Sequence, residues 1–108
     1  MKPFFIFVPT KDLAGTASFY GDTLGLTESW REGDDTVAFG LPDSDLELMV
    51  STTAGEQGPM YLVPSVSEWV RQHADLEIVV PLEEIPGGVV VGLTDPAGNA
   101  FYVFDQAD

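Results

Sequence analysis

A single carboxylate, that of Glu47, occupies a position in the sequence that predicts apolar surroundings. Alternate side chains of a strand point to opposite faces, so within residues 46–51 Glu47 points away from Leu48. An ionised carboxylate among apolar groups is costly unless it has a partner. We expect Glu47 to meet a cation, a hydrogen-bond donor or a metal, or to act as a general base. The alternative is a mouth open to water, or an ion pair with Arg31 or Arg71.

The strands expected around Glu47 are apolar on both faces. One set of alternate residues should pack under helices as core: Phe4, Ile6, Val8, Leu46, Leu48, Val50, Tyr61, Val63, Phe101 and Val103. The other set, with two aromatics whose register is a guess (Trp30 and Phe39), gives the candidate ligand-binding residues: Phe5, Phe7, Trp30, Phe39, Glu47, Met49, Met60, Leu62, Tyr102 and Phe104. The second face must be covered by the rest of the chain, a second chain or a ligand. Plain core packing is the alternative for each aromatic.

Catalysis by this chain would need a second group near Glu47. Tyr102 or His73 could serve as an acid–base partner if either came within hydrogen-bond reach of the same substrate. The chain has no cysteine and no serine in a recognisable nucleophile elbow. His73 is expected to face solvent from a helix, so the residues favour binding over chemistry.

The elements that position these residues are predicted in the order β-α-β-β-β, written twice. In the first half we expect strands over 4–8, 26–31, 36–41 and 46–51, and a helix over 13–24 capped by Thr10 or Asp12. The buried stripe of that helix should be Leu13, Ala17, Tyr20 and Leu24, ending at Gly25. In the second half we expect strands over 60–63, 76–80, 89–94 and 100–104, a helix over 65–73 with a capping box, an irregular turn over 83–88 and a tight loop over 95–99.

A constant shift of 55 positions relates the two halves. It aligns residues 4–10 with 59–65 and residues 46–49 with 101–104. The sequence therefore predicts a duplicated module, with module one about 1–53, a linker about 54–58 and module two about 59–108. Each module alone would bury too little surface, so a single domain of 108 residues with a shared core is expected.

The chain is strongly acidic, with 18 acidic and 4 basic residues and a net charge of −14. Such a charge disfavours nucleic acids and anionic membranes as partners, and it would attract a cationic ligand. Solubility or adaptation to salt would explain the same charge. No apolar run approaches a membrane span and no signal peptide is visible, so a cytoplasmic location is expected.

Several of these features together resemble the vicinal oxygen chelate superfamily, which includes glyoxalase I, extradiol dioxygenases, fosfomycin-resistance enzymes and bleomycin-resistance proteins. They are the duplicated unit, Asp12, Phe19-Tyr20, Leu24-Gly25-Leu26, Leu46-Glu47-Leu48, and Asp95-Pro96-Ala97-Gly98-Asn99 before a terminal strand. The resemblance covers essentially the whole chain. It implies an α+β fold in which two β-α-β-β-β modules form a curved mixed sheet around a cavity (the glyoxalase/bleomycin resistance fold).

The resemblance also implies where a metal would bind in the family's metalloenzymes. Those positions fall here on Phe5, Glu47, Met60 (or Pro59) and Tyr102. Only Glu47 is a usual ligand, so we predict no metal, no cofactor and no metal-dependent chemistry. The metal-free branch similar to bleomycin-resistance proteins is left.

The lead hypothesis is a metal-free homodimer that sequesters a planar aromatic or cationic compound such as an antibiotic. A metal-independent lyase or isomerase with Glu47 as general base, or a dimeric interaction module without ligand, is the alternative. The sequence leaves open the identity of the ligand, whether a reaction is catalysed, and whether the modules pair within one chain or swap between chains.

Overall fold

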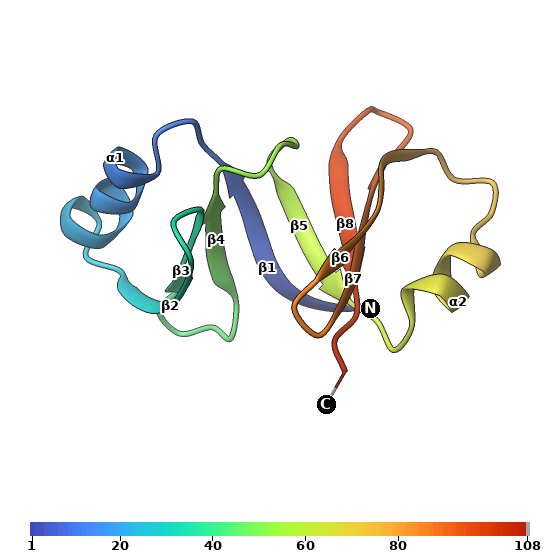
Figure 1. The fold of residues 1–108 in the computed structure, drawn as a ribbon, viewed down its shortest axis with the longest axis horizontal. Coiled ribbons are helices and arrows are strands. Elements are labelled where there is room, and N and C mark those ends of the chain that lie inside the picture. The colour runs from blue at the N-terminus through green and yellow to red at the C-terminus, as the bar shows by residue number, and fades with distance from the viewer. Residues whose placement is uncertain (108) are drawn as a thin grey trace. The chain divides into compact units, whose positions relative to one another are not determined.

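A computed structural model describes residues 1–107. Contacts between residues divide the chain into two compact units. Module one is residues 4–57, and module two is residues 58–107 together with residues 1–3. Figure 1 shows the same kinds of element in each module, a helix beside a small sheet.

Module one follows the order strand, helix, three strands. Its elements are β1 (Lys2–Pro9), α1 (Leu13–Ser18), the π-helical turn η1 (Phe19–Thr23), β2 (Thr27–Glu32), β3 (Thr36–Gly40) and β4 (Glu47–Ser51). The strands lie in the order β2-β3-β4-β1. Strands β1 and β4 are parallel, whereas β2, β3 and β4 are antiparallel neighbours.

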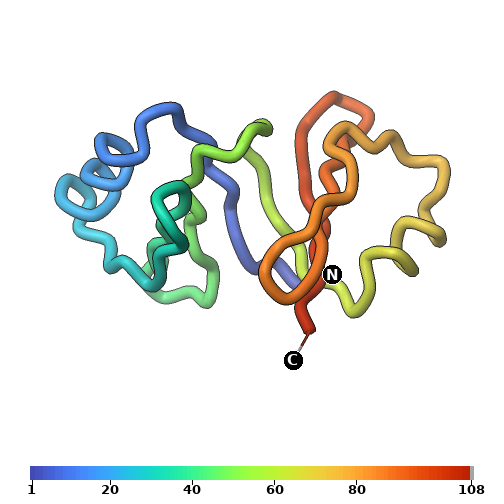
Figure 2. The backbone as a smooth tube through the Cα atoms, in the orientation of Figure 1, coloured from blue at the N-terminus to red at the C-terminus, as the bar shows by residue number. Residues whose placement is uncertain are grey.

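Module two repeats this arrangement. Its elements are β5 (Gly58–Leu62), α2 (Val66–Gln72), β6 (Ile78–Ile85), β7 (Gly88–Thr94) and β8 (Ala100–Phe104). The strand order β6-β7-β8-β5 matches that of module one, and β5 and β8 are again a parallel pair. The backbone tube in Figure 2 follows the same strand–helix–hairpin–strand path in each module. The predicted β-α-β-β-β duplication is confirmed.

The helix starts agree with the predicted caps. The Asp12 carboxylate accepts from the Gly15 backbone N–H, and the Ser65 hydroxyl accepts from the Glu68 N–H. Each bond satisfies one N–H that a helix start leaves without an intrahelical partner. Gly25 has φ = 73°, the left-handed conformation expected after a helix end.

The end of the first helix differs from the prediction. Its second half is a π-helical turn, in which the Leu24 N–H bonds to the Phe19 carbonyl five residues earlier. This wider turn changes the phase of the apolar stripe. Leu24 is 54% exposed, and Leu26 packs against the core instead. The expected burial of Leu24 was therefore wrong.

Strand β6 also differs from the prediction, because it runs through the first half of the segment expected to be an irregular turn. It begins at Ile78 and continues through Pro81 to Ile85, with irregular register between Ile78 and Glu83. Proline is tolerated there because β6 is the last strand of the sheet, and an edge strand bonds on one side only. The turn is confined to Pro86 and Gly87.

The helix-facing core of each module contains some of the residues predicted from strand alternation: Val8, Leu48 and Val50 in module one, and Val63 and Val103 in module two. In module one the buried cluster is Val8, Val37, Phe39, Leu48 and Val50. In module two it is Val63, Val66, Val91, Leu93 and Val103. Both clusters pack against residues of the adjacent helix, so each helix covers one face of its own sheet.

One carboxylate links α2 to the strands of module two by hydrogen bonds. Asp105 accepts from the Val66 N–H at 2.7 Å and from the Val89 N–H at 3.1 Å. Val66 is the first residue of α2, and Val89 is near the start of β7. The carboxylate therefore joins three elements of module two.

Replacing Asp105 by Ala should lower the free energy of unfolding by about 1–3 kcal/mol, because two N–H groups lose a charged acceptor. Urea denaturation at neutral pH measures the change. The control is Asp75→Ala, which removes an exposed carboxylate. Equal stability of the two variants would contradict this role of Asp105.

An aspartate in the loop between β7 and β8 stabilises that loop by hydrogen bonds. The Asp95 carboxylate accepts from the Asn99 side-chain amide and from the backbone N–H groups of Ala97 and Asn99. These bonds favour the ionised form, so the pKa of Asp95 lies below its ordinary value, with the Asn99 side chain as the largest cause. The stabilisation is present above the ordinary pKa and is lost as the pH falls through the lowered one.

Asn99→Ala should raise the pKa of Asp95 toward its ordinary value, since the largest cause of the lowering is removed. A pH titration followed by the ¹³C resonance of the Asp95 carboxyl measures it. Gln106→Ala, which removes an exposed amide from the same module, should leave the pKa of Asp95 unchanged. A pKa that does not move in Asn99→Ala would show that the backbone bonds alone set it.

Candidate functional site

The candidate site in module one is the sheet face that points away from α1. Register places Glu47 beside Phe5 on one side and beside Gly40 on the other. The next row along the same face pairs Met49 with Phe7 and with Ala38. The predicted grouping of the carboxylate with Phe5, Phe7 and Met49 on one face is thus present.

Trp30 supplies the partner that Glu47 needs. Its indole Nε1–H donates to Glu47 Oε1 at 3.0 Å, and both side chains are half-buried. The ring of Phe5 meets the indole edge-on, with 5.9 Å between ring centroids. An N–H donor compensates a carboxylate that apolar neighbours would otherwise leave poorly solvated.

The small residues of β3 allow Trp30 to reach Glu47. Trp30 lies on β2 and pairs with Ala38, while Glu47 lies on β4 and pairs with Gly40, so the indole bridges across β3. Bulky side chains on this face of β3 would obstruct the bond. Thr36, Ala38 and Gly40 alternate with the core residues of β3. This run of small residues on one face is a signal in the sequence that could have placed Trp30 next to Glu47.

Open space remains above Gly40, next to the carboxylate. A Cβ built on Gly40 would meet no atom within 4 Å. Since Gly40 and Glu47 are paired, this space opens on the same face as the Glu47 side chain. The face therefore combines a held carboxylate, the half-buried Trp30 ring packed on the buried ring of Phe5, and room for a further group.

The equivalent face of module two is closed. Tyr102 pairs with Met60 and with Gly92, and Gly92 pairs with Val80. A Cβ on Gly92 would lie 2.7 Å from Val80 Cβ and 3.0 Å from Tyr102 Cε1. In module two, therefore, the tyrosine ring and the valine fill the space beside the glycine.

The remaining candidates of module two share this face, and they are well covered. Leu62 pairs with Phe104 in the row after Met60 and Tyr102. Met60, Tyr102 and Phe104 are each at most 6% exposed, and Leu62 is half-buried.

Phe39 does not join the other candidates. It pairs with Leu48 and belongs to the helix-facing core, where its ring lies 6.2 Å from that of Tyr20. The register guessed for β3 was wrong by one residue, which moves a side chain to the opposite face.

Three other expectations about charged and titratable groups also need correction. Arg31 and Arg71 form ion pairs with Glu28 and Glu68, three residues away in each case, rather than with Glu47.

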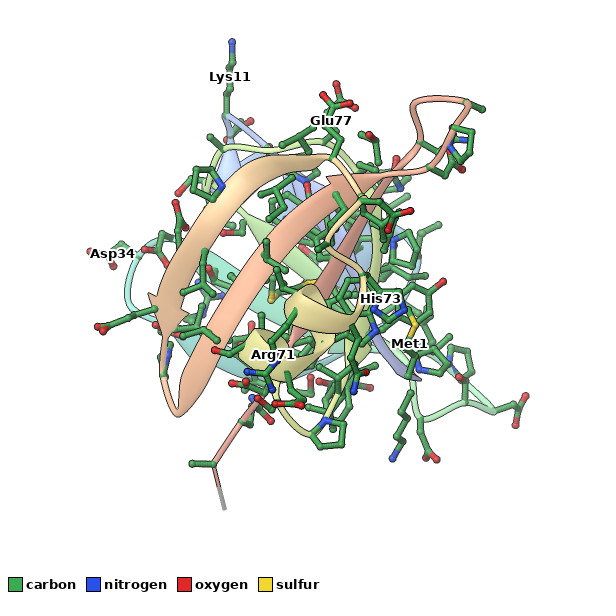
Figure 3. The ribbon with its side chains drawn as sticks, turned by 90° about the vertical axis from the view of Figure 1, so that its right-hand side faces the viewer. Met1, Lys11, Asp34, Arg71, His73 and Glu77 are labelled. Atoms are coloured by element: carbon green, nitrogen blue, oxygen red, sulfur yellow. The ribbon has the colours of Figure 1, made fainter. Side chains whose placement is uncertain are left out.

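His73 is not a plain solvent-facing residue. It ends α2, stacks on Trp69 with 4.1 Å between ring centroids, and its Nδ1 contacts the Trp69 carbonyl at 2.7 Å. Figure 3 shows Arg71 and His73 at α2.

The donor chemistry of these faces does not fit a transition metal. The positions that the resemblance implied as ligands hold one carboxylate and a phenyl ring in module one, and a thioether and a phenol in module two. Within residues 1–107 no group of three or more His, Asp or Glu side chains is arranged to hold a metal ion. Structural and catalytic zinc sites use three or four nitrogen, oxygen or sulfur ligands. The prediction that this chain uses no metal stays a prediction.

Comparison with known proteins identifies the family to which this chain belongs. The topology of both modules is that of the glyoxalase/bleomycin resistance fold, and the model of the Glyoxalase/Bleomycin resistance protein/Dioxygenase superfamily matches residues 3–103. The chain belongs to this superfamily. No protein of curated function matches it in sequence.

Solved structures with the same fold are distant in sequence. An NAD-dependent benzaldehyde dehydrogenase from Legionella pneumophila is 19% identical with a TM-score of 0.77, over 94% of this chain and 97% of that chain. A superfamily member from Vibrio splendidus 12B01 is 16% identical with a TM-score of 0.67, over 94% and 96%. Methylmalonyl-CoA epimerase from Streptomyces coelicolor is 16% identical with a TM-score of 0.72, over 100% and 99%. At these identities the likeness extends to the fold alone.

No helix formed by residues 1–107 has the length and hydropathy that crossing a membrane would require.

The two glycines beside Glu47 and Tyr102 give a direct test of which face is open. Gly92→Ala should lower the free energy of unfolding by about 1–3 kcal/mol, because the new methyl group collides with Val80 and Tyr102. Gly40→Ala is the matched control and should change stability by less than about 0.5 kcal/mol. Chemical denaturation measures both. A larger loss in Gly40→Ala than in Gly92→Ala would reverse the assignment.

Proposed function

We propose that this chain is a metal-free small-molecule binding protein that takes a planar aromatic or cationic compound on the Glu47 face of module one. The observation that carries the proposal is the carboxylate held by Trp30 beside open space at Gly40. The bond from the indole fixes the direction of the carboxylate, so less side-chain freedom is lost when a ligand binds.

The chemistry of this face suits a cationic aromatic ligand. The half-buried Trp30 ring offers apolar area and a negative ring face, which attract flat and positively charged groups, and the buried Phe5 ring packs against it. Glu47 can accept from a cationic N–H of the ligand, a stronger bond than one between neutral groups. The net charge of −14 would attract such a ligand from solution.

Binding without reaction fits the residues better than catalysis does. Glu47 already accepts a hydrogen bond from Trp30, and the hydroxyls of Thr36 and Ser51 on this face are buried and bonded to each other. Sequestration of a toxic compound such as an antibiotic, in a homodimer, is therefore the biological role that we propose. Membership of a superfamily that includes bleomycin resistance proteins supports this role.

A thermal-shift experiment tests the proposal. Proflavine, a planar cation, should raise the melting temperature by about 5 °C at roughly ten times its Kd, whereas anthraquinone-2-sulfonate, a planar anion, should not. Metal-free bleomycin is the antibiotic probe. Each ligand is measured with and without Zn²⁺ and Mn²⁺. A rise that requires the metal would contradict metal-free binding.

Glu47→Gln should weaken proflavine binding about tenfold or more while the protein stays folded, because a charged hydrogen bond is lost. Glu77→Gln makes the same change of charge at an exposed residue of module two (Figure 3) and is the control for the general field. Isothermal titration calorimetry measures both. Equal Kd values for Glu47→Gln and wild type, with both folded, would refute a role of Glu47 in binding.

A further inference from the structure

A hollow lies in module one, on the side of the sheet that carries α1. Its volume is about 630 Å³, and its walls come from α1, η1, β2 and β3. The residues that line it are Leu13, Ala14, Ala17, Ser18, Gly21, Asp22, Leu26, Glu28, Arg31, Asp34 and Phe39. We call this hollow the helix-side groove. The core residue Phe39 lies on its floor, so the groove is on the opposite face from Glu47.

The apolar part of the helix-side groove is made by small residues on one side of the helix. Ala14, Ala17, Ser18 and Gly21 recur at helical spacing and leave room that larger side chains would fill. Gly21 lies within the π-helical turn η1, and a Cβ on it would be only 3.3 Å from the Phe39 ring. The turn therefore sits close to the floor, and π-helical turns are frequent at functional sites.

The polar part of the groove carries excess negative charge. Asp22, Glu28 and Asp34 contribute three carboxylates, and Arg31 contributes the one cation of its lining. Arg31 is engaged by Glu28 at 2.9 Å, and this hydrogen bond raises the pKa of the arginine. Ser18 donates to Asp22 at 3.0 Å, which directs that carboxylate. Arg31 forms its ion pair with Glu28, and Asp34 also raises the pKa of Arg31 electrostatically without an ion pair, so Asp22 and Asp34 are the two carboxylates of the lining outside that pair.

We propose that the helix-side groove is a second ligand site, which takes a small organic cation, an amine attached to an aromatic or alkyl body. The amine is recognised by Asp22 and Asp34, and the body lies against Ala14, Ala17 and Phe39. A volume of this size suits a small ligand, and the apolar floor with a few polar groups is typical of such sites. An anion of the same shape is repelled by the surplus of carboxylates.

The test is a titration of the ¹⁵N-labelled protein with 2-phenylethylamine, followed by backbone amide chemical shifts. We expect saturable shifts at the amides of Ala14, Ser18 and Gly21, with a Kd on the order of 1 mM for a ligand of this size. Phenylacetate, the matched anion, should give no saturable shifts there. Shifts from phenylacetate of equal size would overturn the proposal.

Two pairs of variants locate the site. Ala14→Leu fills the groove from an exposed position and should abolish the saturable shifts, whereas Ala54→Leu, in the exposed linker, should leave them intact. The double variant Asp22→Asn with Asp34→Asn should weaken binding about threefold to tenfold. Asp43→Asn with Asp45→Asn changes the net charge equally and should not. Equal effects within either pair would overturn the proposal.

The proposal is independent of the Glu47 face. Glu47→Gln should leave the amine titration unchanged, because Glu47 lies on the other side of the sheet. Amide shifts that centre on Trp30 and Met49, and that vanish in Glu47→Gln, would assign the amine to the Glu47 face and overturn the second site.

Discussion

The hydrogen bond from Trp30 to Glu47 is the interaction on which the candidate site depends. A carboxylate beside Phe5 and Met49 would be unfavourable without a donor, and the indole N–H supplies one at 3.0 Å. The bond in turn requires that Trp30 reach across β3, which only small residues on that strand permit. The bond to the Glu47 carboxylate thus depends on the strand order, the register and the small side chains of β3 in module one.

The two modules have the same topology, yet they treat equivalent positions differently. Glu47 and Tyr102 are 55 residues apart, and each pairs with a glycine on the adjacent strand. At Gly92 the neighbouring ring and valine leave no room for a methyl group, whereas at Gly40 nothing approaches within 4 Å. The duplicated fold therefore differs locally between its modules: the space beside Gly92 is filled by its neighbours, whereas the space beside Gly40 is open.

The sequence predicted the fold and which residues share the candidate face in most cases, because strand alternation and the repeat are strong local signals. The first and last strands of each module were placed on the correct faces, including Phe5 and Glu47. The signals failed where the structure departs from a regular period. The register of β2 against β3 shifts between Glu28 and Trp30, so the side chains of β2 do not alternate regularly between the two faces. On β3, Phe39 was assigned to the wrong face. A π-helical turn likewise removed Leu24 from the core.

The indole ¹⁵N–¹H resonance of Trp30 reports most directly on the bond at the centre of this account. The chain has two tryptophans, so a Trp69→Phe variant assigns the signal. If Trp30 donates to Glu47, its indole proton should be protected from exchange with water. Glu47→Gln replaces the charged acceptor by a neutral one and should therefore move the indole resonance and speed its exchange. An indole signal that exchanges rapidly in wild type and has the same position in wild type and Glu47→Gln would contradict the account.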